Sequence, residues 1–146
     1  MLNTQKQIEE PKSGASFRIQ GFALDIDGIT RALGHSPSHT HRQGELGPLN
    51  KPFPRDMWML DSPLDAREQL GAHLNWLAEI LLSHRQYLSA LRNVTETDIY
   101  CRYTCYSEQA SLHLSPESLR IFAELDLAFE VSIIFIPEPD AYSTPP

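Results

Sequence analysis

Three of the six histidines, His35, His39 and His41, lie within seven residues of one another in the segment GHSPSHTH. If this segment is extended, His39 and His41 share one face of the chain, because side chains alternate along a strand. Imidazole nitrogens are common zinc ligands, and His35 or Glu45 could complete such a site. The other interpretation is that all three lie in water, since serine, proline and glycine surround them. A small metal-dependent or ligand-binding enzyme that uses these histidines is therefore our alternative hypothesis.

Other combinations of reactive residues are explained without catalysis. Asp25 and Asp27 could hold Mg²⁺ beside a phosphate, but either one also serves as a helix cap, and no glycine-rich phosphate loop accompanies them. Cys101 and Cys105 are four residues apart in a predicted strand, which separates them by ~13 Å, so we expect two free buried thiols. The sequence contains no serine elbow and no H-E-x-x-H motif. It favours a protein without catalysis and without a cofactor.

Composition and charge limit the class of protein and of partner. The 146 residues are 41% apolar, which is enough for one globular domain. Only three lysines are present and the net charge is −7, so no basic stripe is available to neutralise phosphates. No apolar run reaches the ~18–20 residues of a membrane span, and the polar N-terminus does not resemble a signal peptide. We therefore expect a cytoplasmic protein that binds neither nucleic acid nor membrane.

The elements that position these residues are predicted from hydrophobic periodicity. A helix from 63–65 to 91 has leucines at steps of four and three, with a break expected near 83–86. Two shorter helices are bounded by Asp25 or Asp27 with Gly34, and by a start at Ser115 followed by proline. The predicted strands are 15–24, 40–44, 56–60, 99–106, 110–114 and 128–136. The last strand is apolar on both faces, which is typical of a central strand.

The order β-α-β-β-α-β-β-α-β predicts an α+β fold. We expect a mainly antiparallel sheet with helices packed on it, related to the ferredoxin-like split β-α-β arrangement. The single domain is predicted to span residues 15–136. Residues 1–14 are expected to form a flexible arm, and 137–146, with four prolines in ten residues, a flexible tail.

Several motifs in a fixed order resemble a known family. They are F-x-I-x-G at Phe17, I-T-x-x-L-G-x-x-P at Ile29, Gly44, W-x-L at Trp58 and L-S-P-E-S-L at Leu114. Together the motifs resemble a widespread bacterial family of small cytosolic domains of unknown function, over roughly residues 17–135. The resemblance implies no activity and no catalytic residues. It predicts glycine after the third helix, where this chain has Asp126, a residue type that tolerates the left-handed conformation better than most.

A recognition surface is predicted around the loop 45–55, which is rich in glycine and proline and is followed by acidic residues. An acidic surface steers a basic partner by long-range attraction. We therefore expect a non-catalytic protein-binding domain, most concretely a bacterial immunity protein that neutralises a toxin effector by occluding it. The partner would be a protein, for which a basic toxin domain is one candidate. The predicted contact residues are Glu45, Leu49, Phe53, Asp56, Asp61, Asp65 and Glu68.

Overall fold

A computed structural model describes residues 9–137 as one sheet of five strands with four helices. Along the sheet the strands follow the order β2-β3-β1-β4-β5. The elements are β1 (Lys12–Gly21), α1 (Ile26–Leu33), β2 (His39–His41), a 3₁₀ turn (Pro48–Asn50), β3 (Asp56–Asp61), α2 (Leu70–Leu82), α3 (Arg85–Arg92), β4 (Glu96–Cys105), α4 (Pro116–Leu125) and β5 (Ala128–Phe135). Of the predicted flexible segments, residues 1–8 and 138–146 lie outside the described residues.

The sheet is mixed and mostly antiparallel. Strand β1 pairs antiparallel with β3 on one side and β4 on the other, and β2 pairs antiparallel with β3. Strand β5 pairs parallel with β4, and helix α4 forms the connection between them. The α+β expectation is therefore confirmed. The first four strands have the order of the ferredoxin-like split β-α-β arrangement, to which α4 and β5 are added.

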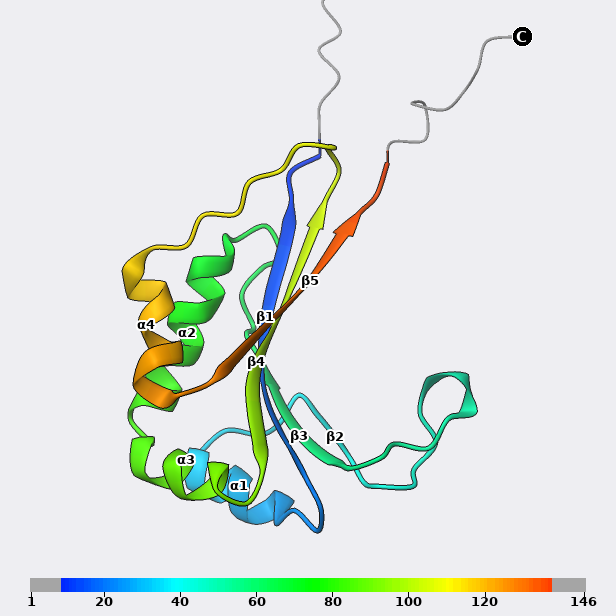
Figure 1. Cartoon of the computed structure of the whole chain (residues 1–146), viewed down its shortest axis with the longest axis vertical. Coiled ribbons are helices and arrows are strands. Elements are labelled where there is room, and N and C mark those ends of the chain that lie inside the picture. Colours follow the sequence, from blue (N-terminus) through cyan, green and yellow to red (C-terminus); the bar gives the residue numbers. More distant parts are fainter. Residues whose placement is uncertain (1–8, 138–146) are drawn as a thin grey trace, which may run out of the picture.

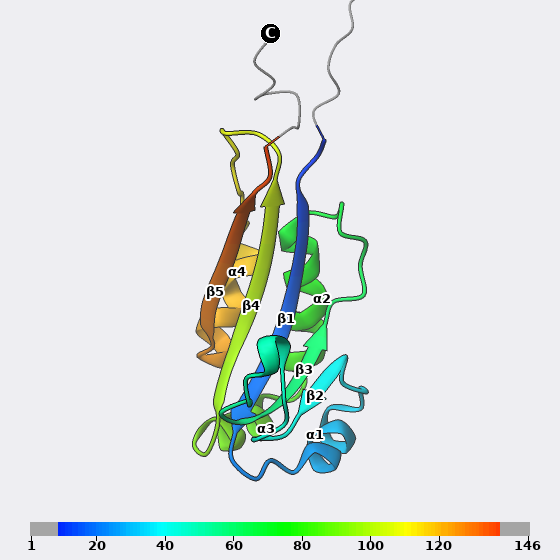
Figure 2. The same ribbon diagram turned by 90° about the vertical axis from the view of Figure 1, so that its right-hand side faces the viewer.

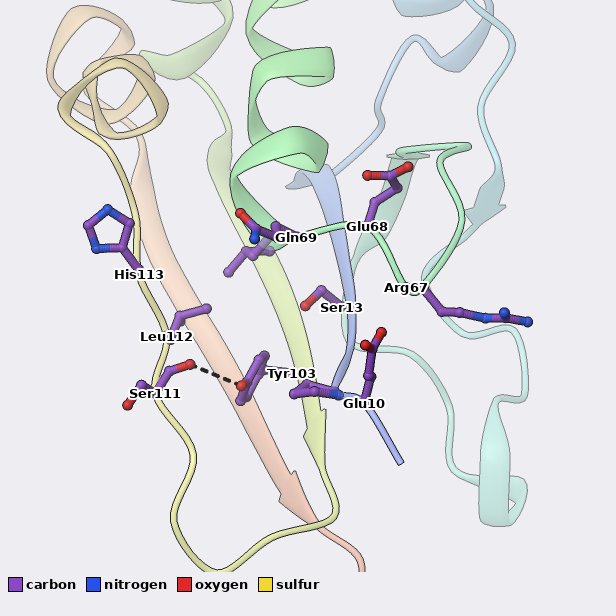
Figure 3. A pocket seen from close by; sticks show the side chains of 11 residues that line it. Glu10, Ser13, Arg67, Glu68, Gln69, Tyr103, Ser111, Leu112 and His113 are labelled. Atoms are coloured by element: carbon purple, nitrogen blue, oxygen red, sulfur yellow. Dashed lines mark hydrogen bonds between the residues drawn. The ribbon is translucent and has the colours of Figure 1, made fainter. Parts of the chain in front are cut away.

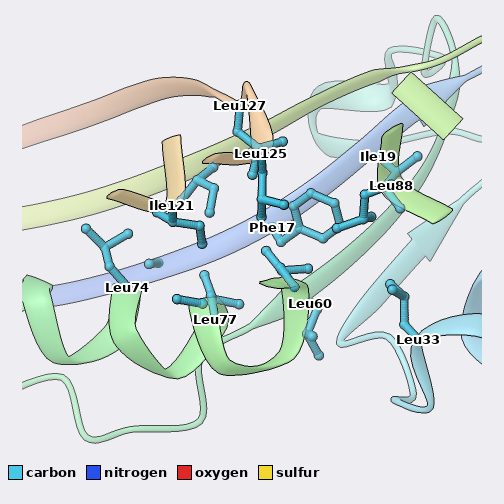
Figure 4. Close-up of a cluster of buried hydrophobic side chains, with 14 of the residues drawn as sticks. Phe17, Ile19, Leu33, Leu60, Leu74, Leu77, Leu88, Ile121, Leu125 and Leu127 are labelled. Carbon is cyan, nitrogen blue, oxygen red and sulfur yellow. The ribbon is translucent and has the colours of Figure 1, made fainter. Parts of the chain in front are cut away.

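The hydrophobic core lies between the sheet and helices α2 and α4 (Figure 4). Phe17 and Ile19 of β1 are fully buried there, because odd-numbered residues of this central strand face the helices. Leu74 and Leu77 of α2 and Ile121 of α4 fill the opposite side with no exposed surface. Figure 1 shows the helices on one side of the sheet and the β2–β3 connection projecting on the other. The face of the sheet toward the helices thus forms the hydrophobic core, and the opposite face is not covered by helices.

The ends of α1 and α4 follow the predicted capping residues. The Asp25 side chain accepts a hydrogen bond from the Gly28 amide at the start of α1, and Gly34 ends this helix in the left-handed conformation (φ 68°). The Ser115 hydroxyl accepts from the Ser118 amide at the start of α4. Both helices therefore begin where a side chain satisfies a free backbone amide.

The predicted long helix is two helices. It begins at Leu70 instead of 63–65, because residues 62–69 run beside β1, where the Ser13 amide donates to the Ala66 carbonyl (2.7 Å). The expected break is confirmed, since α2 ends at Leu82 and α3 begins at Arg85. The strands that form begin and end within three residues of the predicted ranges.

Two strand predictions are wrong. Residues 110–114 form no strand, because β4 is already paired with β1 on one edge and β5 on the other and has no free edge for a hairpin. Strand β5 is not central but lies at the border of the sheet (Figure 2), and its Ile133 and Ile134 are 67% and 48% exposed. Burial within this chain therefore does not explain why β5 is apolar on both faces.

Candidate functional site

The β2–β3 loop, residues 42–55, projects from the side of the sheet that faces away from the helices (Figure 1). Its two limbs are held together by backbone hydrogen bonds. The Gly44 amide donates to the Phe53 carbonyl (2.9 Å), and the Phe53 amide donates to the Glu45 carbonyl (2.9 Å). The loop is therefore a hydrogen-bonded extension of the β2–β3 hairpin, which holds its tip at a defined place.

The tip of this loop presents two leucines to solvent. Leu46 is 67% exposed and Leu49 is 88% exposed. A hydrogen bond from the Gly47 amide to the Lys51 carbonyl (2.8 Å) closes the turn that carries Leu49. Leu49 (φ 62°) and Asn50 (φ 55°) both adopt the left-handed conformation, which is rare for leucine. The turn therefore has an unfavourable backbone conformation and exposes a large apolar side chain.

Aromatic stacking fixes the base of the loop. The Phe53 ring stacks on the His41 ring at a centroid distance of 3.6 Å, and His39 Nε2 lies 3.0 Å from His41 Nδ1. A Cβ atom on Gly47 would lie 2.6 Å from the Phe53 ring, so only glycine fits above it. His41 is buried, and this burial together with the neighbouring His39 lowers the pKa of His41. Burial and the neighbouring His39 therefore favour neutral His41.

Asp56, one of the predicted contact residues, is used inside the fold. Its carboxylate is buried and accepts hydrogen bonds from the amides of Gln43 (2.8 Å) and Leu24 (2.9 Å) and from Nη1 of Arg42 (2.9 Å). These donors, the Gln43 amide first, lower the pKa of Asp56. Asp56 therefore braces the root of the β2–β3 loop against the segment that precedes α1.

The face of the sheet opposite the helices, here called the open face, carries paired charges. Arg18 of β1 binds Asp98 of β4 through two nitrogens and reaches Glu130 of β5 (3.1 Å). The Arg18 guanidinium also lies over the Tyr100 ring, 4.6 Å from its centroid. These cross-strand contacts hold the three strands in register and leave Arg18 little freedom to bind a ligand.

Asp61, a second predicted contact residue, is half-buried on the open face and accepts a hydrogen bond from the Ser16 hydroxyl. Asp65 and Glu68 are exposed, in the segment that leads to α2. The six residues of β3 separate these two carboxylates from the loop residues by ~20 Å. The structure therefore brings Glu45, Leu49 and Phe53 together in the loop but does not join them with Asp65 and Glu68.

The three clustered histidines separate in space. His35 lies against Trp76 of α2, with ring centroids 6.1 Å apart, whereas His39 and His41 contact each other on β2. Within residues 9–137, no three histidine, cysteine, aspartate or glutamate side chains gather as a metal would need. The structure therefore brings together two of the three proposed metal ligands.

Both cysteines are free and buried, as predicted. Burial raises the pKa of the Cys101 thiol to about 12. Since the thiolate is the reactive form of cysteine, this side chain is held in its unreactive state at neutral pH.

A cavity of about 440 Å³, which sequence reasoning missed, lies at the N-terminal end of α2 (Figure 3). The Tyr103 hydroxyl in its wall donates to the Ser111 carbonyl (3.1 Å). Among the described residues, no hydrogen bond joins His113 to a hydroxyl group that it could activate. No sequence signal marked this cavity, because its walls come from four separate segments of the chain. Its polar lining includes Glu10, Ser13, Glu68, Gln69, Tyr103 and His113.

We compared the chain with models of protein families, and one model matches most of its length. The model of a domain of unknown function, DUF4279, matches residues 10–135. The chain belongs to the DUF4279 family. The DUF4279 match covers all five strands and all four helices of the described residues. No curated protein and no solved structure matches the chain. In the described part of this DUF4279 domain, no helix has the length and apolar character needed to cross a membrane.

Proposed function

We propose that this DUF4279 domain is a non-catalytic protein-binding module whose β2–β3 loop inserts into its partner. More concretely, we propose a bacterial immunity protein that blocks a toxin effector by occluding it. The observation that carries the proposal is the tip of the loop, where Leu46 and Leu49 are exposed on a hydrogen-bonded turn. Occlusion requires shape, apolar contact and charge, and it requires no reacting group.

The energetics of the tip favour binding over a structural role. A left-handed leucine costs roughly 1–2 kcal/mol, and Leu49 recovers none of this by packing, since it is 88% exposed. Such strain persists where a function depends on it. Transfer of Leu46 and Leu49 into an apolar pocket of a partner would return ~1.5–3 kcal/mol for each side chain. The preformed turn also reduces the conformational entropy lost on binding.

Charge supports a basic partner. The chain carries a net charge of −7, whereas at the tip itself Glu45 is balanced by Lys51, so the attraction comes from the whole chain and not from the loop. An acidic protein attracts a basic partner over distance, which mainly raises the association rate. Asp65 and Glu68, being far from the tip, are proposed to act through this long-range attraction and not through contact.

The proposal is tested by capturing the tagged protein from its native host, grown alongside competitors, and identifying the proteins that co-purify. Wild type is compared with the double variant Leu46→Ser/Leu49→Ser. The matched control is Val94→Ser, which removes an equally exposed apolar side chain (78%) at the α3–β4 turn. We expect one stoichiometric, basic protein to be retained by wild type and by the control. Its affinity for the double variant should fall by about tenfold or more.

Two further results decide the proposal. Equal affinity of the double variant and wild type for the captured partner would show that the loop is not the contact surface. For the immunity function, production of the captured protein in a sensitive host should stop growth, and co-production of this domain should restore it. If the captured protein were harmless to the host, the protein-binding proposal would stand and the immunity proposal would be wrong.

A further inference from the structure

Strand β5 has an unpaired outer edge. It borders the sheet beyond β4 (Figure 2), and among the described residues no strand pairs with its other side. The Ile136 amide donates to the Cys105 carbonyl of β4 (2.9 Å). Because backbone groups alternate along a strand, the amides and carbonyls of Val131, Ile133 and Phe135 point outward. The edge therefore offers a regular row of donors and acceptors to another strand.

The side chains along this edge are apolar on both faces of the sheet. Five of them, here called the β5 patch, are 42–67% exposed. Natural proteins usually protect an exposed edge with charged residues, a proline or a bulge. Between residues 131 and 136 this chain has none of these devices, although Glu130, which Arg18 binds, and Pro137 flank this stretch. The β5 patch consists of Phe129, Ile133, Ile134, Phe135 and Ile136.

We infer that β5 pairs antiparallel with β5 of a second copy of this chain, so that two five-stranded sheets join into one. A two-fold axis through Ile133 makes the pairing self-complementary, with Ile133 opposite its own copy and Val131 opposite Phe135. Ile133 has outward-pointing backbone groups, so the central pair exchanges two hydrogen bonds. This register brings the exposed residues Ile133–Ile136 of both copies to the centre of the contact.

The strand β5 itself carries no unpaired charge that would oppose a second copy, although the net charge of −7 on each chain acts against association over distance. Glu130 is the one charged residue of β5, and it is already bound by Arg18 (3.1 Å). In the proposed register Glu130 faces Ile136, so no two carboxylates are opposed. A strand from a charged partner would find no counter-charge along this edge, whereas an identical apolar strand needs none.

The size of the patch predicts a reversible dimer. The five side chains expose on the order of 400 Å² per copy, if each offers about 150 Å² when fully exposed. Two copies therefore cover at most on the order of 800 Å² of side-chain surface before the backbone is counted, against ~1,200–2,000 Å² for standard interfaces. Ile133 and Phe135 also border a hollow of about 390 Å³ beside Tyr103 and Leu112, which can receive side chains of the second copy.

The test measures the mass of the full chain by light scattering across a wide range of concentrations. We expect the mass to rise from 16.6 kDa toward twice this value. Ile133→Lys and Ile134→Lys should weaken association by about tenfold or more, because each places a charge in the apolar contact. The lysine at position 133 would face its own copy, and the one at position 134 would face Ser132 and lie diagonal to its copy. Val94→Lys, an exposed apolar site outside the β5 patch, should associate like wild type. Circular dichroism verifies that each variant is folded.

A cross-link tests the register. In Ile133→Cys the two introduced thiols lie in a hydrogen-bonded pair with ~5.5 Å between Cα atoms, within the range of a disulfide. Mild oxidation of Ile133→Cys should give a covalent dimer, whereas oxidation of Val94→Cys should not. The native Cys101 and Cys105 do not interfere, because both are buried. A chain that stays monomeric at every concentration would overturn the inference. Association that folded Ile133→Lys and Ile134→Lys leave unchanged would also overturn it. Neither result depends on the partner of the β2–β3 loop.

Discussion

His41 links the charge of one side chain to the geometry of the β2–β3 loop. Its ring stacks on Phe53 and contacts His39, and burial followed by the charge of His39 lowers the pKa of His41. Glu45 and Asp56 oppose this shift from the loop and from β3. Since the pKa of His41 is lower in the folded state, the fold favours its neutral form. The resulting stability is complete above the unfolded pKa of ~6.5 and is lost as pH falls through the folded pKa.

We therefore expect the free energy of unfolding to decrease on acidification below ~pH 6.5, and to decrease less in His41→Gln. Denaturant unfolding of both proteins at about pH 7.5 and about pH 5.5 measures the difference. A part of the loss should persist in the variant, because burial also lowers the pKa of His73. If wild type and His41→Gln lost equal stability between the two values, His41 would not contribute.

At the scale of the single element, helix α4 ends at Asp126, whose backbone conformation is unfavourable for a residue other than glycine. Asp126 adopts the left-handed conformation (φ 52°), which confirms that aspartate takes the place where the resemblance predicted glycine. Its exposed carboxylate binds Arg92 (3.1 Å), an interaction worth ~0–1 kcal/mol. Asp126→Gly loses this ion pair but removes the left-handed cost, whereas Asp126→Ala loses the ion pair and keeps the cost.

We expect Asp126→Gly to be more stable than Asp126→Ala by ~1 kcal/mol. Thermal or denaturant unfolding measures the difference, and the ion pair cancels because both variants lack it. The matched control is Ala123→Gly, at an exposed position inside α4, which should instead destabilise the protein by ~1 kcal/mol. An Asp126→Gly variant that is less stable than Asp126→Ala would show that the turn does not depend on the left-handed conformation.

The elements show which features the sequence could predict. Caps and turns are local, so Asp25, Gly34 and Ser115 marked the ends of α1 and α4 correctly. Strand pairing is not local. Residues 110–114 alternate like a strand, but whether a strand forms depends on a free neighbouring edge, and β4 has none. The apolar faces of β5 indicated a central strand, and in this chain they lie at the border of the sheet.

The residues of the candidate site also divide into those that the local sequence could predict and those that depend on the tertiary fold. Glu45, Leu49 and Phe53 are close in sequence, and the prediction that they share one surface needed only the loop itself. Asp56 was predicted as a contact, but its three donors come from two other segments, so its buried role required the tertiary fold. The walls of the cavity beside α2 come from segments distant in sequence, so no motif predicts it. The apolar residues of β5 are local, but the place of β5 at the border of the sheet depends on which strands pair with it.

At the scale of the whole molecule, the β2–β3 loop separates binding from folding. Every residue of the described core cluster lies outside residues 34–57, so the loop adds nothing to the packing of sheet and helices. The bond between the Gly44 amide and the Phe53 carbonyl marks where the hairpin can be shortened without disturbing the stack on His41. Replacement of residues 45–52 by Asn-Gly, which favours a two-residue hairpin turn, removes the tip together with the Glu45 carbonyl and Gly47. It keeps Gly44, Phe53 and the stack on His41.

We expect this shortened chain to fold with a free energy of unfolding within ~1 kcal/mol of wild type, because loop-closure entropy changes slowly with loop length. Its partner affinity should fall by at least as much as that of the double leucine variant, while its self-association through β5 should be unchanged. Unfolding, partner capture and light scattering on the same preparation measure the three properties. A shortened chain that fails to fold would assign the loop a structural role. A folded one that still binds its partner would move the contact surface to the open face of the sheet.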